Sequence, residues 1–192
     1  MSITKIISSV ITDDAVHDAG GRSRLPWPED SVVEPVFSSC QKYRYRLSEV
    51  WDTNKSLVMW VLMNPSVACV DYRDPTLRKT GKFSRAWGYG GQLVANVHAY
   101  RATDKGRLLE VADPVGPDND EMIRQMAQQA ERIVLAFGKP PRRLRGRGQD
   151  VIKLLEDHSD LCYLRMAKDG VTPFHPLYLP DDTVPVRYVR IG

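Results

Sequence analysis

The fold of this chain is decided by the stretch Ser56-Leu57-Val58-Met59-Trp60-Val61-Leu62-Met63-Asn64-Pro65-Ser66. It is an apolar run of strand length, which is typical of a strand buried on both faces of a parallel sheet. Pro65 has no N–H group and cannot continue a ladder of hydrogen bonds. We therefore expect Asn64 at the carboxyl end of a central strand, where open α/β sheets bind ligands. The alternative is that Asn-Pro-Ser only forms a turn.

Helices and strands alternate through the rest of the chain. Further buried strands are predicted at residues 92–98, 133–137 and 161–164, with a last strand at 186–191. Helices are predicted at residues 74–87, 118–129 and 149–156, the first capped by Asp74 and opened by Pro75. This order predicts an α/β fold: a three-layer sandwich with a central, mostly parallel sheet.

The first 55 residues do not show the alternation of helices and strands that is predicted for the rest of the chain. Residues 12–35 are rich in Asp, Gly, Ser and Pro, so an irregular surface segment is expected there, and residues 1–11 predict an edge strand or a short helix. Residues 43–47 alternate as a half-exposed strand does, and we expect them to form a hairpin with the strand at 56–63. The expected organisation is one domain over residues 1–192, with residues 1–40 as an irregular extension packed on it.

Composition limits the class of protein. The 42% hydrophobic and 27% charged fractions are those of an ordinary globular chain, and the longest apolar run is too short to span a bilayer. The N-terminus lacks the apolar core of a signal peptide, so a cytoplasmic protein is expected, without a membrane partner. Cys40, Cys69 and Cys162 lie far apart, which argues against a disulfide framework, a zinc site or an iron–sulfur cluster. No metal or other cofactor is predicted, and a monomer is expected.

Three polar clusters are expected to meet at one edge of the sheet. They are Asn64-Pro65-Ser66, residues 96–101 and His175-Pro176-Leu177, each placed after a predicted strand or in a late loop. A basic loop free of acidic residues follows the strand at 133–137, and it is either a phosphate-contacting surface or a solvated loop. Its cationic residues are Lys139, Arg142, Arg143, Arg145 and Arg147.

The ordered set of motifs resembles the uracil-DNA glycosylase superfamily, particularly its mismatch-specific branch. The motifs are Asn64-Pro65-Ser66, Asn96 leading to Tyr100-Arg101-Ala102, Phe137-Gly138-Lys139, and His175-Pro176-Leu177. The resemblance covers roughly residues 56–180 and implies a uracil-DNA glycosylase-like fold. The uracil-specific branch has an aspartate where this chain has Asn64, so ordinary uracil specificity is not implied.

The chain also resembles a family of small bacterial and phage proteins that is catalogued as a domain of unknown function. The matching segments span most of the chain: Met63 to Ser66, Asp74-Pro75-Thr76, Trp87 to Gly90, Tyr100 to Asp104, Asp113 to Gly116, Asn119-Asp120 and His175 to Tyr178. Relatives of this general type include anti-phage glycosylases that remove modified bases from viral DNA. The resemblance therefore implies excision of a modified base.

Cleavage of a glycosidic bond assigns roles to the catalytic candidates. Asn64 would hold a water through its amide oxygen, and Asp71 or Asp74 would add negative potential near the cationic sugar. The alternatives are that Asp74 only caps a helix and Asp71 is only a loop residue. His175 would donate a hydrogen bond to the departing base, or it is a packing histidine.

Other residues would bind the extruded base and the DNA. Asn96 would read a base edge or cap a strand end, and Tyr72, Tyr100 or Tyr178 would stack on the base unless they belong to the core. Ser66 and Arg101 would contact phosphates, and Leu177 with Tyr178 would fill the gap left in the duplex.

The sequence thus predicts a monofunctional, metal-independent DNA glycosylase whose partner is duplex DNA with a modified or damaged base, and phage hypermodified pyrimidines are one candidate target. Two alternatives stay open. One is an enzyme that processes free nucleotides or nucleosides in the same pocket, and the other is a nucleic-acid-binding module without catalysis.

Overall fold

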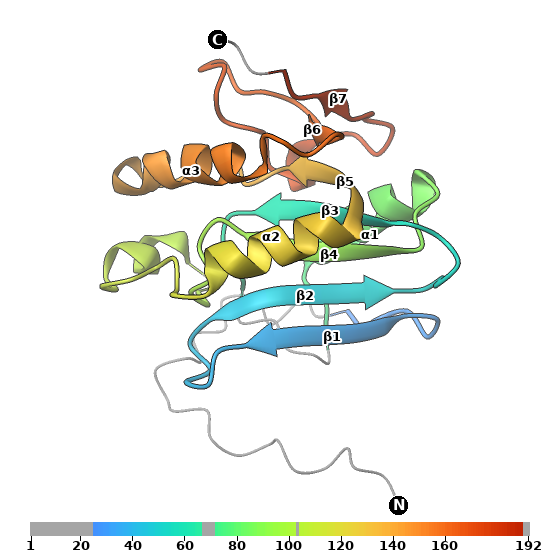
Figure 1. Cartoon of the computed structure of the whole chain (residues 1–192), viewed down its shortest axis with the longest axis horizontal. Coiled ribbons are helices and arrows are strands. Elements are labelled where there is room, and N and C mark those ends of the chain that lie inside the picture. The colour runs from blue at the N-terminus through green and yellow to red at the C-terminus, as the bar shows by residue number, and fades with distance from the viewer. Residues whose placement is uncertain (1–24, 67–71, 103, 190–192) are drawn as a thin grey trace, which may run out of the picture.

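A computed structural model describes residues 25–66, 72–102 and 104–189 (Figure 1). Asp71, Cys69 and the segment predicted as an edge strand or helix at 1–11 lie outside the described residues. The described residues form one seven-stranded sheet with three α-helices, so the chain has a mixed α/β fold. None of the helices in these ranges is long and apolar enough to cross a membrane.

The sheet has a parallel centre and antiparallel edges. Its order is β1-β2-β4-β3-β5-β6-β7, in which β4, β3, β5 and β6 run parallel and the pairs β1–β2, β2–β4 and β6–β7 are antiparallel. The prediction of a mostly parallel sheet therefore holds for the centre only. The strands are β1 Val32–Phe37, β2 Arg44–Val50, β3 Leu57–Leu62, β4 Gly91–Asn96, β5 Ala130–Leu135, β6 Leu161–Tyr163 and β7 Val186–Arg187.

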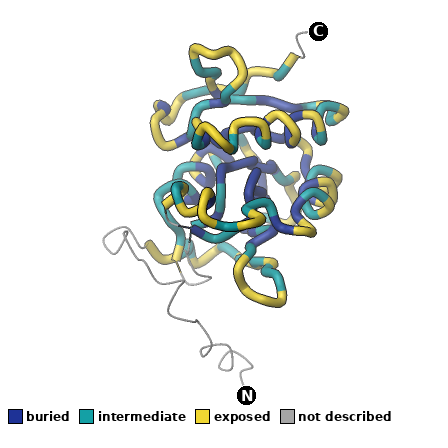
Figure 2. The backbone as a smooth tube through the Cα atoms, turned by 90° about the vertical axis from the view of Figure 1, so that its left-hand side faces the viewer, coloured by how far each residue is buried: buried dark blue, intermediate teal, exposed yellow. Residues whose placement is uncertain are grey.

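Helices cover both faces of the sheet. The α-helices are α1 Pro75–Ala86, α2 Asn119–Gln129 and α3 Arg145–Leu155, and short 3-10 turns lie at η2 Lys105–Leu109, η3 Arg142–Leu144 and η4 Pro176–Tyr178. In Figure 1, α2 and α3 lie in front of the sheet, and Figure 2 shows the buried strands between more exposed outer layers. As predicted, Asp74 caps α1 and Pro75 opens it: the Asp74 Oδ1 atom accepts from Leu77 N at 2.8 Å.

The strand β3 contributes to two separate cores because its side chains alternate between the two faces. Met59 and Val61 pack under α2 and α3, whereas Val58 and Trp60 pack under α1. All four side chains are fully buried, so β3 is a central strand, as its apolar run predicts. Trp60 satisfies its indole N–H by donating to Ser84 Oγ of α1 at 2.9 Å.

Three predictions about local structure were wrong. β2 does not form a hairpin with β3, because β4 lies between them: the turn after β2 is held by Trp51 N and Asp52 N, which both donate to Gly90 O just before β4. Residues 32–37, expected to be irregular, form the edge strand β1, whose alternating half-buried positions pair with β2. The helix expected at 149–156 begins at Arg145, inside the predicted basic loop.

The connections leave β3 and β5 in opposite directions. The chain after β3 passes through α1 on one face of the sheet, whereas the chain after β5 passes through α3 on the other face. In open α/β sheets such a divergence between adjacent parallel strands opens a crevice at their carboxyl ends. Asn64 follows β3 and Gly138 follows β5, so the two border this crevice.

Candidate functional site

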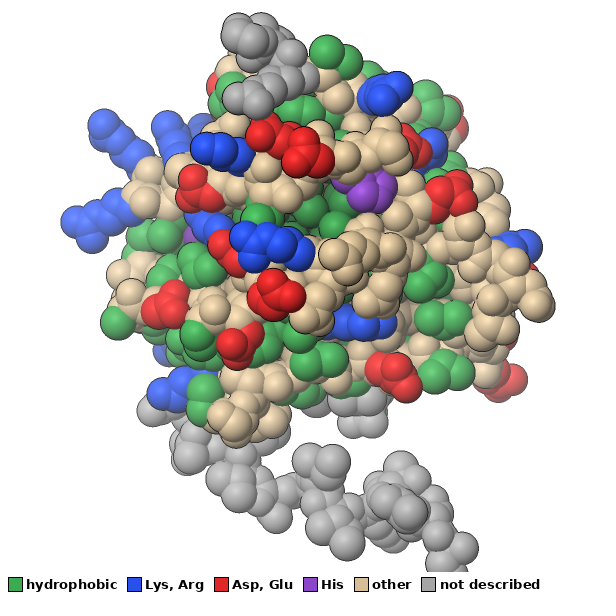
Figure 3. Space-filling model, viewed as in Figure 1, with side chains coloured by type: hydrophobic (Ala, Val, Ile, Leu, Met, Phe, Trp, Pro, Cys, Tyr) green, Lys and Arg blue, Asp and Glu red, His purple; other side chains and the backbone are tan. Residues whose placement is uncertain are grey.

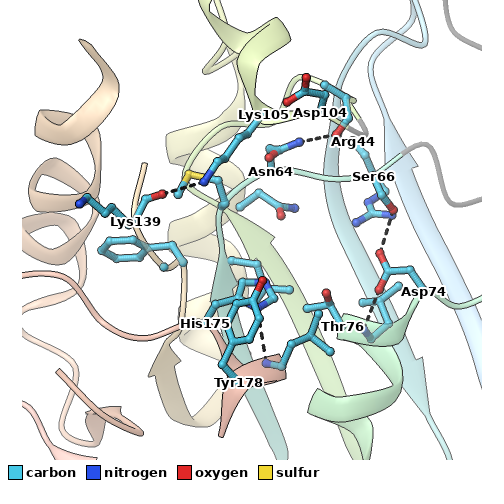
Figure 4. A pocket seen from close by; sticks show the side chains of 18 residues that line it. Arg44, Asn64, Ser66, Asp74, Thr76, Asp104, Lys105, Lys139, His175 and Tyr178 are labelled. Atoms are coloured by element: carbon cyan, nitrogen blue, oxygen red, sulfur yellow. Dashed lines mark hydrogen bonds between the residues drawn. The ribbon is translucent and has the colours of Figure 1, made fainter. Parts of the chain in front are cut away.

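A cavity of about 560 Å³ occupies the crevice at the carboxyl ends of β3, β4 and β5 (Figure 4). Residues that follow these strands, the first turn of α1 and the η4 segment all contribute to its walls. The three polar clusters expected at one edge of the sheet therefore do meet. Eight predicted site residues line the cavity: Asn64, Ser66, Asp74, Asn96, Lys139, His175, Leu177 and Tyr178.

Asn64 is held in one orientation by its own amide group. Its Nδ2 atom donates to Ala102 O at 2.6 Å and to Pro65 O at 3.1 Å, the first of which is drawn in Figure 4. Because both amide hydrogens go to backbone carbonyls, the Oδ1 atom remains as the acceptor in a residue that lines the cavity. Asn-Pro-Ser therefore holds the amide of Asn64 in a fixed orientation in the cavity wall.

His175 is held in one tautomer by the start of η4. Its Nδ1 atom accepts from Leu177 N at 3.4 Å, which leaves Nε2 as the protonated nitrogen of the neutral ring. Burial lowers the pKa of His175 below its ordinary 6.5, a change that Asp74 opposes and Lys105 reinforces. A neutral imidazole that can donate from Nε2 is thus the dominant form at pH 7. The chain approaches His175 closely at Gly138, whose φ is +65°, and a Cβ there would lie 3.0 Å from the His175 Cβ.

Asp74 joins the cavity wall to α1. One carboxylate oxygen caps the helix at Leu77 N, and the other accepts from Ser66 Oγ at 2.8 Å (Figure 4). The helix-cap alternative for Asp74 is therefore correct, yet its negative charge also lies at the cavity. Ser66 orients Asp74, which is a different role from the phosphate contact predicted for it.

Asn96 forms part of the cavity wall at the carboxyl end of β4. Its side chain is 1% exposed, and neither Oδ1 nor Nδ2 has a hydrogen-bond partner among the described residues. A buried amide without partners is uncommon, because each lost hydrogen bond is costly. This donor and acceptor pair is available to a ligand in the cavity.

Exposed side chains, one of them aromatic, surround the mouth of the cavity. Tyr178 is 79% exposed and Leu177 is 39% exposed, and the His175 and Tyr178 rings lie 5.9 Å apart. Lys105, on η2, donates from Nζ to Lys139 O at 3.3 Å and so links two sides of the mouth. The exposed residues at the rim can contact a larger partner while the inner wall holds a small group.

A comparison with known protein families decides where the chain belongs. The family of proteins of unknown function DUF1643 matches residues 44–177, more than half of the chain. The chain belongs to the DUF1643 family. The matched range begins at Arg44 and ends at Leu177, and both residues line the cavity. No curated protein matches the chain, and no solved structure matches it.

Other predicted site residues of this DUF1643 protein lie outside the cavity walls. Tyr72 is 42% exposed, and Tyr100 packs edge-on against Tyr43 at 5.7 Å, which is a structural contact. Arg101 donates to Gln41 O and lies over the Phe37 ring, so it fastens β1 and the following turn. These positions do not support base stacking by Tyr100 or a phosphate contact by Arg101.

The predicted basic loop divides into two parts. Arg142, Arg143 and Arg145 are exposed, in η3 and the first residue of α3, and Figure 3 shows cationic side chains projecting from the left of the molecule, where α3 lies in Figure 1. Arg147 instead pairs with Asp120 and donates to Val97 O at 2.9 Å. Arg147 therefore joins α3 to α2 and β4, and its position does not support the predicted DNA contact.

Several lining residues were not predicted from the sequence. Arg44 is the most unusual, since it is 3% exposed and lies in a segment that was assigned only as a half-exposed strand. The others are Leu62, Met63, Thr76, Leu77, Ala102, Asp104, Lys105, Phe137 and Gly138. No group of three or more His, Cys, Asp or Glu side chains that could hold a metal occurs within the described ranges.

Proposed function

We propose that this DUF1643 protein is a monofunctional DNA glycosylase with a uracil-DNA glycosylase-like fold. It hydrolyses the N-glycosidic bond of a modified or damaged base that has been turned out of the duplex, and it leaves an abasic site. Phage hypermodified pyrimidines are the first class of target to test, with a role in anti-phage defence or in repair. The protein acts on DNA as a monomer in the cytoplasm.

The reaction needs three groups at one place. Water adds its oxygen to the sugar C1′ atom while the C1′–N bond breaks, the bonding electrons leave with the base, and the water proton neutralises the base anion. Asn64 Oδ1 accepts a hydrogen bond from the water, and the neutral His175 donates from Nε2 to the base as negative charge develops there. Asp74 supplies negative potential toward the cationic sugar.

One observation carries the proposal: Asn64, Asn96 and His175, which come from three distant parts of the chain, line the same cavity. Each offers the group that its proposed role needs. Asn64 has an oriented acceptor, His175 has an oriented donor, and Asn96 has an unpartnered amide that can read a base edge. Lys139 in the cavity wall and the exposed Arg142, Arg143 and Arg145, a few residues further along the chain, suit the DNA backbone.

The test uses duplexes that carry uracil, mismatches or phage-type modified pyrimidines, and it scores abasic sites by strand cleavage in alkali. The wild-type protein should form abasic sites on at least one duplex, and Asn64→Ala should reduce the rate at least about 100-fold. Asn54→Ala, in the exposed turn before β3, is the matched control and should leave the rate unchanged. If no duplex yields abasic sites, or if Asn64→Ala changes nothing, the proposed function is wrong.

A second candidate is an enzyme that acts on free nucleotides or nucleosides in the same cavity. The inner wall of the cavity favours it, because the buried Arg44 and Asn96 suit a small polar ligand that enters completely. This candidate predicts turnover of the small molecules and no binding of duplex DNA. The third, a nucleic-acid-binding module, predicts salt-dependent DNA binding without release of a base.

A further inference from the structure

Arg44 is a feature of the cavity that the proposed roles of Asn64 and His175 leave unexplained. Its side chain lines the cavity at 3% exposure, and its Nε atom has no hydrogen-bond partner. The guanidinium forms no ion pair with an acid in the described ranges. A buried charge without a counter-ion destabilises the folded protein, so a residue of this kind indicates a binding partner of opposite charge.

A β-bulge turns Arg44 toward the cavity. The register of β1 and β2 advances from Val36 opposite Arg46 to Phe37 opposite Arg44, so Tyr45 is an extra residue in β2. Regular alternation would put Arg44 and Leu47 on opposite faces of the sheet, because they are three residues apart. With the bulge, Leu47 packs in the α1 core and Arg44 lines the cavity on the same face.

Arg44 remains charged although it is buried. Burial lowers its pKa to about 10, and Asp74 raises it while Arg101 lowers it further. Asp74 acts on Arg44 through space, because none of the ion pairs in the described ranges joins the two residues. A full positive charge is therefore present at the inner wall at neutral pH.

The neighbours of Arg44 also favour a negatively charged ligand. Asn96 lies on β4, the strand that pairs with β2, and its Nδ2 donor has no partner. Among the charged residues that line the cavity, Arg44, Lys105 and Lys139 outnumber Asp74 and Asp104. The cavity thus has an excess of positive charge, with its most buried cation unpaired.

We propose that Arg44 binds an oxyanion of the ligand, a phosphate or a carboxylate, with Asn96 donating a further hydrogen bond beside it. The planar fork of guanidinium N–H groups matches the paired oxygens of such an anion, and burial strengthens the interaction. This inference names the substrate class of the proposed site, and it rests on the proposed function in taking the ligand to be a nucleotide. The anion has two possible sources: a nucleotide phosphate or an acidic substituent on the base.

The test is calorimetric titration of the full chain with matched charged and neutral ligands. One arm compares the 5′-monophosphates of the four deoxynucleosides with the four deoxynucleosides, and the other compares 5-carboxy-2′-deoxyuridine with 2′-deoxyuridine. In at least one arm the anion should bind the wild-type protein about tenfold more tightly than its neutral partner, as expected for a charge-assisted hydrogen-bond pair. The arm that shows the preference identifies the source of the anion.

Variants assign the preference to Arg44. Arg44→Met should abolish it and Arg44→Lys should retain part of it, because lysine keeps the charge without the planar fork. Arg46→Met is the matched control: Arg46 lies two residues along the same strand, outside the cavity walls, and its loss should leave the preference intact. Equal affinity for charged and neutral ligands in both arms, absence of binding in both, or a preference that survives Arg44→Met would overturn the inference.

Thermal melting without ligand separates a binding role from a packing role. Arg44→Met should melt at a higher temperature than the wild-type protein, because it removes an uncompensated buried charge. A lower melting temperature would assign Arg44 to packing and overturn the inference. These titrations need no base release, so an Arg44-dependent preference together with inactivity on every duplex would refute the proposed function alone.

Discussion

Strands β2 and β4 carry a buried polar pair at each end, and the two pairs differ in one respect. At one end, Glu49 of β2 accepts from Gln92 Nε2 of β4 at 2.6 Å and from Ser31 Oγ at 3.1 Å, and Gln92 also donates to Leu77 O of α1. At the other end, Arg44 of β2 and Asn96 of β4 are also buried, but Arg44 Nε and both amide atoms of Asn96 have no hydrogen-bond partner in the described part of the chain. The first pair is hydrogen-bonded within the protein, although Gln92 Oε1 has no partner among the described residues, and the second pair is not.

The presence or absence of side-chain hydrogen bonds distinguishes a structural pair from a ligand site. Gln92 and Asn96 are amides on the same face of the same strand, four residues apart, and both are fully buried. Gln92 lies under α1, where Gly81 allows close approach: a Cβ on Gly81 would lie 3.2 Å from Gln92 Nε2. Asn96 lies beyond the start of α1, where the cavity opens. We infer that Gln92 stabilises the fold and that Asn96 is kept for the ligand.

The largest expected effect comes from breaking the hydrogen bond between Gln92 and Glu49. Gln92→Met removes the donor to a buried carboxylate, and we expect a loss of roughly 3–4 kcal/mol in the free energy of unfolding. Burial raises the pKa of Glu49 above its ordinary 4.5, and hydrogen bonds from Gln92 and Ser31 oppose this change. The loss should shrink as the pH falls through that pKa, because a protonated carboxyl depends less on the donor. Urea denaturation at several pH values measures both effects. If Gln92→Met lost less than about 1 kcal/mol of unfolding free energy at pH 7, the structural role given to the Glu49–Gln92 pair would be wrong.

A somewhat smaller effect is expected from His98, which follows Asn96 beyond the end of β4. Its ring is 1% exposed, has no hydrogen-bond partner among the described residues and does not line the cavity. Burial, assisted by the charge of Arg147, lowers its pKa from 6.5 to about 4. Between these pH values the unfolded chain binds a proton that the folded protein does not, so stability falls by up to about 3 kcal/mol as the pH decreases.

The variant His98→Leu isolates this contribution. The difference in unfolding free energy between wild type and His98→Leu should change across pH 6.5 to 4, and it should be constant above pH 7. An identical pH dependence in the two proteins would show that His98 is not held neutral. His98 is therefore a useful contrast to Asn96. Both side chains lack a hydrogen-bond partner among the described residues, but His98 does not line the cavity, and its burial is expected to lower stability at acidic pH.

The smallest expected effect on stability belongs to Asn96→Leu. Replacing an unpartnered buried amide by an apolar side chain of similar size should change the free energy of unfolding by less than about 1 kcal/mol. Gln92→Met is the matched comparison on the same face of β4. A loss for Asn96→Leu as large as that for Gln92→Met would show that both ends of the strand pair are structural.

The sequence predicted the centre of the fold and the residues Asn64, Asn96 and His175 of the cavity, but not Arg44 in its inner wall. The apolar run ending at Asn64 identified a central strand, and strand order then implied that Asn96 and His175 would reach the same edge. These predictions rested on local periodicity and on the geometry of parallel sheets, both of which are visible in a single sequence.

Arg44 could not be predicted in the same way. The alternating segment at residues 43–47 gives no sign of the extra residue at Tyr45, which arises from pairing with β1. The hairpin prediction failed for a related reason, because nothing local shows that β4 inserts between β2 and β3. For Arg147 the sequence suggested a site residue where the structure has an ion pair. Its basic neighbours indicated a DNA contact, but Arg147 pairs with Asp120, which lies 27 residues earlier in the chain.

The most direct test of the account measures free base by mass spectrometry after incubation of the protein with DNA of differing base modification. The wild-type protein should release a base from at least one DNA, Asn96→Leu should remain folded and release at least about 100-fold less, and Gln92→Met should retain the wild-type rate per folded molecule. Release of no base by the wild-type protein from any DNA, or equal release by Asn96→Leu, would contradict the assignment of this cavity to base excision.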